Sequence, residues 1–172
     1  MTYNLHPIFV HFPVAMLFVY SIIKVLPLKK WFPNVAWRDI ERVLLVVGVL
    51  GAFAALATGD AAEHLVHPNR ALVNAHSNFA AIATFIYGAL LVGEIAAIIN
   101  ARHYIYGKSW QWISAILQFI ETVLCNPIFS GILSALGFIA ISITGLLGGT
   151  IAYGLTADPV APFVLKMLGI SL

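Results

Sequence analysis

Four long stretches of this chain carry very few charged side chains, and they cover roughly residues 8–27, 40–58, 76–99 and 128–154. A helix needs about 20 apolar residues to cross the hydrocarbon layer of a bilayer, and each stretch is long enough. Charged residues make up only 9% of the chain, whereas a soluble domain has about 25%. We therefore expect an all-α integral membrane protein, a four-helix bundle that forms a single transmembrane domain over residues 1–172.

The segment 110–125, just before the last span, has a different pattern. It is short for a spanning helix, and polar side chains recur in it at helical spacing. These are Gln111, Ser114, Gln118, Glu121 and Cys125. Such a segment fits an amphipathic helix that lies in the membrane interface, with its two tryptophans as anchors. The alternative is a fifth span whose polar face packs against the bundle.

Lysine and arginine are distributed unevenly along the chain. Five of them lie in the connection 24–42, and Arg102 and Lys108 follow the third span, whereas none precedes the first span. Short loops rich in these residues face the cytoplasm. We therefore expect the N-terminus, the C-terminus and the 59–75 loop on the outer side. Glu94, inside the third span, is expected near the cytoplasmic end, where it can pair with Arg102.

Histidine shows the opposite asymmetry. On this topology five of the six histidines fall at the outer side, and only His103 falls at the cytoplasmic side. The five are His6, His11, His64, His67 and His76. Ionisable groups that cluster at membrane depth are costly and usually functional. The set therefore predicts a site, although any one of these histidines could be a simple interfacial residue.

One chemistry that suits the histidines is b-type haem ligation. It needs two imidazoles on different helices, with apolar walls around the ring. His11 and His76 fit best, because each is expected about one turn inside a membrane boundary on a separate span. His6, with His64 or His67, could complete a second and more exposed site.

Gly145 and Gly149 form a small-xxx-small pair in the last span, on the same outer side. Glycines at this spacing let another helix approach closely. Alternatively, their missing side chains make room for a flat macrocycle.

A second chemistry is a directly bound zinc, iron or copper ion. Imidazoles combined with carboxylates suit these metals, and the candidate ligands are His6, His11, His76, Asp60 and Glu63. Asp60 and Glu63 stand one helical turn apart, so they could also fix the tautomer of an imidazole by accepting a hydrogen bond from its N–H. Such a site would serve metal handling or metal-dependent hydrolysis.

Several other function classes have no support in the sequence. No Lys/Arg cluster interleaved with aromatic residues indicates nucleic-acid binding. A single cysteine, Cys125, excludes an internal disulfide and a cysteine-based metal centre. No nucleophile elbow, phosphate loop or dinucleotide fingerprint is present. An electron carrier or an accessory subunit is therefore favoured over a stand-alone enzyme.

Four short motifs are spread over nearly the whole chain: LHPIFVHFPVAM, ATGDAAE, AHSNFAA and GLLGGTIAYGLTADP. They resemble the landmarks of a bacterial membrane family, domain of unknown function 2231 (DUF2231). The resemblance implies a four-helix bundle in the bacterial inner membrane and points to His6, His11 and His76. The stretch 104–125 departs from the family pattern and looks like an insertion. Some members resemble components found beside cytochromes or Rieske-type proteins, which favours electron transfer.

The sequence thus predicts a small membrane protein that binds haem b at its outer, periplasmic face. It would pass electrons between the quinone level and a periplasmic carrier, or serve as a subunit of a respiratory or photosynthetic complex. The alternatives are the His/carboxylate metal protein and a structural accessory subunit of a membrane complex. Its expected surroundings are lipid and larger membrane assemblies.

Overall fold

A computed structural model describes residues 6–66, 69–101 and 111–170 of the chain. Throughout these residues the regular structure is helical, which confirms the all-α fold class. The elements are α1 (His6–Val25), α2 (Leu28–Trp31), α3 (Trp37–Val66), α4 (Arg70–Ala101), α5 (Gln111–Leu124), α6 (Pro127–Tyr153), the 3-10 turn η3 (Leu155–Ala157) and α7 (Ala161–Met167).

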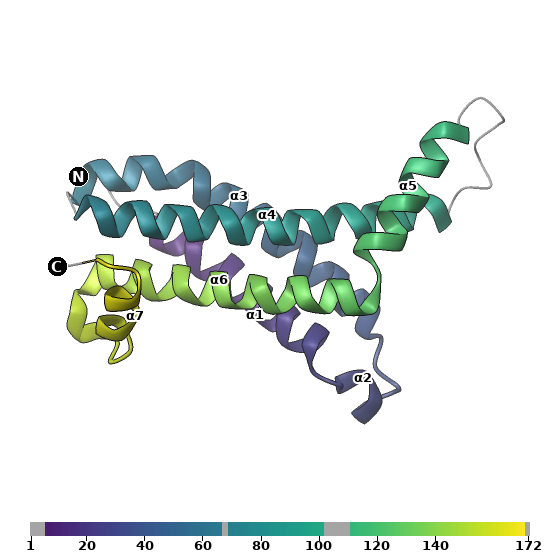
Figure 1. The fold of residues 1–172 in the computed structure, drawn as a ribbon, viewed down its shortest axis with the longest axis horizontal. Coiled ribbons are helices and arrows are strands. Elements are labelled where there is room, and N and C mark those ends of the chain that lie inside the picture. The colour runs from purple at the N-terminus through teal and green to yellow at the C-terminus, as the bar shows by residue number, and fades with distance from the viewer. Residues whose placement is uncertain (1–5, 67–68, 102–110, 171–172) are drawn as a thin grey trace.

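Four long helices form a bundle. α1 packs against α3 and α6, and α4 packs against the same two helices, so the four close into a ring. The four helices run side by side (Figure 1), and buried side chains from all four form one cluster. They include Leu17 and Tyr20 of α1, Leu45 and Val49 of α3, Tyr87 and Leu90 of α4, and Ala140 and Ile141 of α6.

Glycines set how closely these helices approach. A Cβ on Gly48 would lie 2.5 Å from Cδ2 of Leu17, and a Cβ on Gly137 would lie 2.8 Å from Cζ of Tyr87. Both distances are shorter than real Cβ contacts, so α1 and α3, and likewise α4 and α6, could not pack this closely with a larger residue at these positions.

Within the described residues, three helical stretches are long and apolar enough to cross a membrane. They are Trp37–Gly59 in α3, the whole of α4 and the whole of α6. α1 contributes a shorter apolar stretch, Phe9–Val25. α5 has 14 residues, about 21 Å at 1.5 Å per residue, which is shorter than the hydrocarbon layer of about 30 Å.

The connection between α3 and α4 is much shorter than the loop expected at 59–75. α3 continues to Val66, and α4 begins at Arg70 rather than at 76. Helical geometry persists because Pro68 is the first residue after Gly59 that cannot continue a helix. Oδ1 of Asn69 then accepts a hydrogen bond from the backbone N–H of Ala71 at 2.9 Å and caps the new helix. His76 consequently lies well inside α4.

The two ends of the bundle differ in chemistry. The start of α1, the end of α6 and α7 lie at one end, which we call the histidine end; α2 and α5 lie at the other, the basic end (Figure 1). α7, which the sequence did not reveal, folds back on the bundle by burying Leu165 against Leu72 and Leu147.

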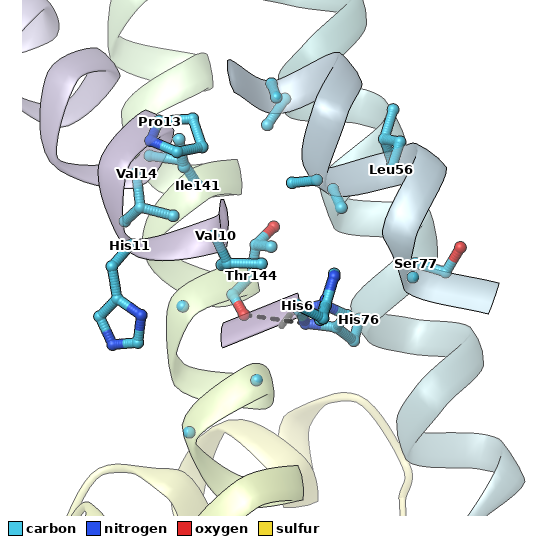
Figure 2. Close-up of a pocket in the computed structure, with 18 of the residues that line it drawn as sticks. His6, Val10, His11, Pro13, Val14, Leu56, His76, Ser77, Ile141 and Thr144 are labelled. Atoms are coloured by element: carbon cyan, nitrogen blue, oxygen red, sulfur yellow. Dashed lines mark hydrogen bonds between the residues drawn. The ribbon is translucent and has the colours of Figure 1, made fainter. Parts of the chain in front are cut away.

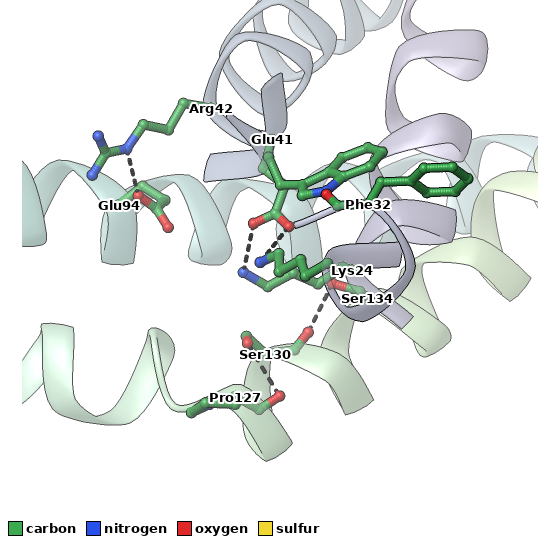
Figure 3. Close-up of polar contacts among 10 residues, drawn as sticks. Lys24, Phe32, Glu41, Arg42, Glu94, Pro127, Ser130 and Ser134 are labelled. Carbon is green, nitrogen blue, oxygen red and sulfur yellow. Dashed lines mark hydrogen bonds and ion pairs between the residues drawn. The ribbon is translucent and has the colours of Figure 1, made fainter. Parts of the chain in front are cut away.

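Ion pairs tie the helices together at the basic end (Figure 3). The buried carboxylate of Glu41 lies 3.2 Å from Nζ of Lys24 and 2.7 Å from Nζ of Lys29. The Lys29 contact is an ion pair without hydrogen-bond alignment, because Oε1 of Glu41 has no hydrogen-bond partner. Nε of Arg42 donates to Glu94 at 3.0 Å. Arg42 thus takes the place that the sequence assigned to Arg102, which lies outside the described residues.

Candidate functional site

A cavity of about 580 Å³ opens at the histidine end of the bundle. All four bundle helices line it, and most of the lining is aliphatic (Figure 2). The hydroxyls of Thr84 and Thr144, which also line it, donate to carbonyls of their own helices at 2.8 Å. The cavity therefore offers a ligand mainly apolar surface and imidazole groups.

His76 is fixed in one orientation by α6. Its Nδ1 lies 3.0 Å from the backbone carbonyl oxygen of Thr144. A carbonyl oxygen only accepts hydrogen bonds, so Nδ1 carries the proton and Nε2 carries the lone pair. The ring also packs on Gly148, where a Cβ would lie 3.1 Å from Cε1 of His76. Any side chain at position 148 would therefore press on the imidazole.

His6 is oriented in the same way by α3. Its Nδ1 lies 3.0 Å from Oγ1 of Thr58. The Thr58 hydroxyl has one proton, and it donates that proton to its own helix at Ala54 or Ala55, at 3.2 and 3.0 Å. His6 also has a hydrogen bond with the backbone of Ala55, so α3 holds its ring at two points, and these contacts fix the position of the ring rather than its tautomer.

The structure brings His6 and His76 together, from α1 and α4, close enough for the two rings to interact electrostatically (Figure 2). His11 also lines the cavity, but its side chain is exposed and lies apart from this pair. Thr58 and Thr144 were not expected to take part. The Thr58 hydroxyl and the Thr144 carbonyl reach the histidines only because the helices pack together, and helix packing leaves no local signal in the sequence.

Gly145 and Gly149 line the cavity as well. A Cβ on either of them would meet no atom within 4 Å. Within the part of the chain that the structure describes, this small-residue pair is therefore not used for close helix packing. It leaves open space beside the histidines.

The remaining predicted ligands cannot be placed in the site. Asp60, Glu63 and His64 belong to the last turns of α3, but the structure does not describe their side chains, and His67 lies outside the described residues. Among the side chains that are described, no three from His, Cys, Asp and Glu are grouped to hold a metal ion. The imidazoles of His6 and His76 are thus the candidate ligands that the described part of the cavity brings together.

Residues 2–158 match the family model described as a predicted membrane protein, DUF2231. The chain belongs to this family. No curated protein matches it, and no solved structure matches it either.

The DUF2231 match covers the whole cavity, from His6 on α1 to Tyr153 at the end of α6. It also spans α5, and it ends before α7 begins at Ala161. The cavity is therefore part of the DUF2231 region itself, whereas α7 lies outside the matched residues.

Proposed function

We propose that this DUF2231 protein binds a b-type haem in the cavity and transfers electrons through it. One observation carries the proposal: two imidazoles from different helices meet in an apolar cavity, and each has its Nδ1 held by a neighbouring helix. Metal-ligating histidines are usually oriented in this way, with the far nitrogen left to bind the metal.

The residues present fit such a group. A cavity of about 580 Å³ is within the range of about 300–1,000 Å³ that is usual for ligand and cofactor sites. Its apolar walls would keep water from the ring, and Gly145 and Gly149 leave space where side chains would stand. When bound there, haem supplies a one-electron redox couple tuned by its axial ligands and by the dryness of the pocket.

The geometry favours His76 with His6 as the axial pair, rather than His76 with His11. His6 and His76 are near enough to interact electrostatically, and both are anchored through Nδ1. His11 is exposed, and a ligand there would be open to lipid or water.

The proposed setting is a bacterial inner membrane crossed four times, with the N-terminus and the histidine end outside. α1 has 20 residues, about 30 Å in length, and it packs beside the helices that are long enough to span. The basic residues of α2 and its flanks gather at the opposite end, as the positive-inside rule requires for a cytoplasmic surface. The electron partner would then be a periplasmic carrier or a larger membrane complex.

A reduced-minus-oxidised visible spectrum of the detergent-purified protein tests the proposal, with metal analysis of the same sample. We expect the sharp α-band of a low-spin b-type haem. The band should be lost in His76→Ala and in His6→Ala, and kept in His11→Ala. Asn78→Ala, an exposed neighbour of His76 on α4, is the control and should leave the spectrum unchanged.

Other outcomes would redirect the assignment. Loss of the band in His11→Ala but not in His6→Ala would restore the axial pair that the sequence favoured. A colourless protein with about one equivalent of zinc, iron or copper, as expected for a single such site, would replace haem with the metal alternative. A sample with neither would leave an accessory role.

A further inference from the structure

A short segment of the chain projects from the bundle at the basic end. α1 stops before Pro27, and α2 then runs to one side of the four helices (Figure 1). α1 has 20 residues, about 30 Å of helix, which matches the hydrocarbon layer of about 30 Å. On the four-span arrangement proposed above, α2 therefore lies at the depth of the lipid headgroups.

Two contacts hold α2 against α3. Nζ of Lys29 lies 2.7 Å from the buried carboxylate of Glu41 (Figure 3). Nε1 of Trp37, in the first turn of α3, donates to the backbone carbonyl oxygen of Phe32 at 2.8 Å. The second contact closes the connection 32–37, so the end of α2 stays beside the start of α3. The outer side of this segment is therefore presented in a defined position.

That outer side combines cationic groups with exposed aromatic rings. Lys30 and Arg38 are exposed, and no carboxylate among the described side chains lies within ion-pair distance of either. Trp31 and Phe32 are 58% and 56% exposed. Aromatic rings next to lysine and arginine are typical of a surface at the boundary between membrane and water. We call Lys30, Trp31, Phe32 and Arg38 the α2 patch.

Positive charge is left over in this part of the chain. Residues 24–42 carry five lysines and arginines but two carboxylates. Those carboxylates, of Glu41 and Asp39, face other cations of the same segment. The charges of Lys30 and Arg38 are therefore the ones that an anionic group from outside the chain can neutralise.

We propose that the α2 patch binds the headgroup of an anionic phospholipid such as phosphatidylglycerol. Lys30 supplies an ammonium group to the phosphate, and Arg38 supplies a guanidinium group that can bind two phosphate oxygens at once. The net negative headgroup is favoured over a zwitterionic one, because a choline group would return the positive charge that the phosphate cancels. The proposal rests on the four-span arrangement given above but not on the haem.

Apolar surface beside the patch favours a lipid over a free phosphate ion. Val25 and Leu26, directly before α2, are 52% and 44% exposed. An acyl chain can lie along them while Trp31 and Phe32 pack beside the glycerol region. The patch therefore offers matching groups to both halves of a phospholipid.

Native mass spectrometry of the purified protein in a non-ionic detergent tests the proposal. Phosphatidylglycerol and phosphatidylcholine with the same acyl chains are titrated separately, and the wild type should retain phosphatidylglycerol preferentially. Lys30→Gln/Arg38→Gln should weaken its retention by at least about tenfold, because each lysine or arginine near an anionic lipid surface contributes about fivefold. Arg70→Gln/Lys166→Gln is the matched control: it removes one arginine and one lysine that are also exposed, at the histidine end, and should bind like the wild type.

A charge-conserving variant separates loss of charge from loss of fold. Lys30→Arg/Arg38→Lys should keep the preference for phosphatidylglycerol, and retention as weak as in the glutamine variant would contradict the proposal. Equal retention of the two lipids by the wild type would overturn it, and so would equal weakening in the matched control. If excess inorganic phosphate displaces phosphatidylglycerol, the patch recognises phosphate alone and the lipid assignment fails. Lipid preference in a protein without a haem spectrum would overturn the haem assignment and leave the α2 patch standing.

Discussion

His76 shows how a single side chain is fixed by a helix far away in sequence. The Thr144 carbonyl holds its Nδ1, and Gly148 lies close to Cε1 and Nδ1 of the ring. The sequence marked His76 because of its place at the outer end of a span. It could not identify these two partners, because they become neighbours only when α4 packs on α6. The spacing of Gly145 and Gly149 could be recognised in the sequence. The role of Gly148 could not, because it depends on the same packing of α4 on α6.

Gly148→Ala should disturb the site specifically. The added Cβ would lie 3.1 Å from Cε1 of His76, so the ring must move by a few tenths of an ångström and its bond to Thr144 must lengthen. Overpacking of this kind costs about 1–3 kcal/mol. We expect a lower haem-to-protein ratio in the purified variant, measured by the haem spectrum against total protein. Gly131→Ala, on the same helix but outside the cavity and with no atom near its Cβ, should retain the wild-type ratio; equal ratios in both variants would refute the support role of Gly148.

A second residue-scale prediction concerns Glu41. Its buried carboxylate faces Lys24 and Lys29, and Glu41→Gln would leave both ammonium groups without their counter-charge. Hydrogen bonds to charged groups contribute about 1.5–3 kcal/mol, and we expect a loss near the lower value because Lys29 is half exposed and partly solvated. Thermal unfolding in detergent measures the change. Asp39→Asn is the control, since its 3.9 Å contact with Arg42 is exposed and should contribute little.

Among the elements, the sequence located helices better than it located their ends. α1 ends before Pro27 and α6 begins at Asn126-Pro127, both positions where local chemistry stops or starts a helix. α3 runs beyond its apolar stretch to Val66, because loss of hydrophobicity does not by itself end a helix. α7 was missed, since seven residues are too few for a periodic pattern.

The start of α6 allows an element-scale test. Oδ1 of Asn126 accepts hydrogen bonds from the backbone N–H groups of Ile128 and Phe129, at 3.0 and 3.2 Å. Removing such a cap costs about 1 kcal/mol. Asn126→Ala should therefore lower the free energy of unfolding by about that amount, as measured by denaturant titration in mixed micelles. Asn126→Asp keeps an accepting oxygen and should be close to wild type; equal destabilisation by both variants would show that the cap is not the cause.

At the scale of the whole molecule, the distribution of basic residues and histidines along the sequence correctly predicted that the two groups lie at opposite ends of the bundle. The described histidines of the cavity and the ion pairs of Glu41 and Glu94 lie at opposite ends of one bundle. This could be predicted because membrane helices are straight and antiparallel, so alternate connections meet at the same end. The cavity itself could not, because its shape depends on which helices are neighbours across the bundle.

Orientation provides the remaining prediction, and cysteine labelling on intact cells measures it. In a Cys125→Ser background, Lys166→Cys on α7 and Thr2→Cys before α1 should react with a membrane-impermeant maleimide, and Lys30→Cys on α2 should react only after the cells are opened. The physical reason is that α1 separates position 2 from position 30 by about 30 Å of helix, enough to cross the hydrocarbon layer. If α1 does not cross, Thr2→Cys and Lys30→Cys will label alike. If the protein is inverted, Lys30→Cys alone will label from outside.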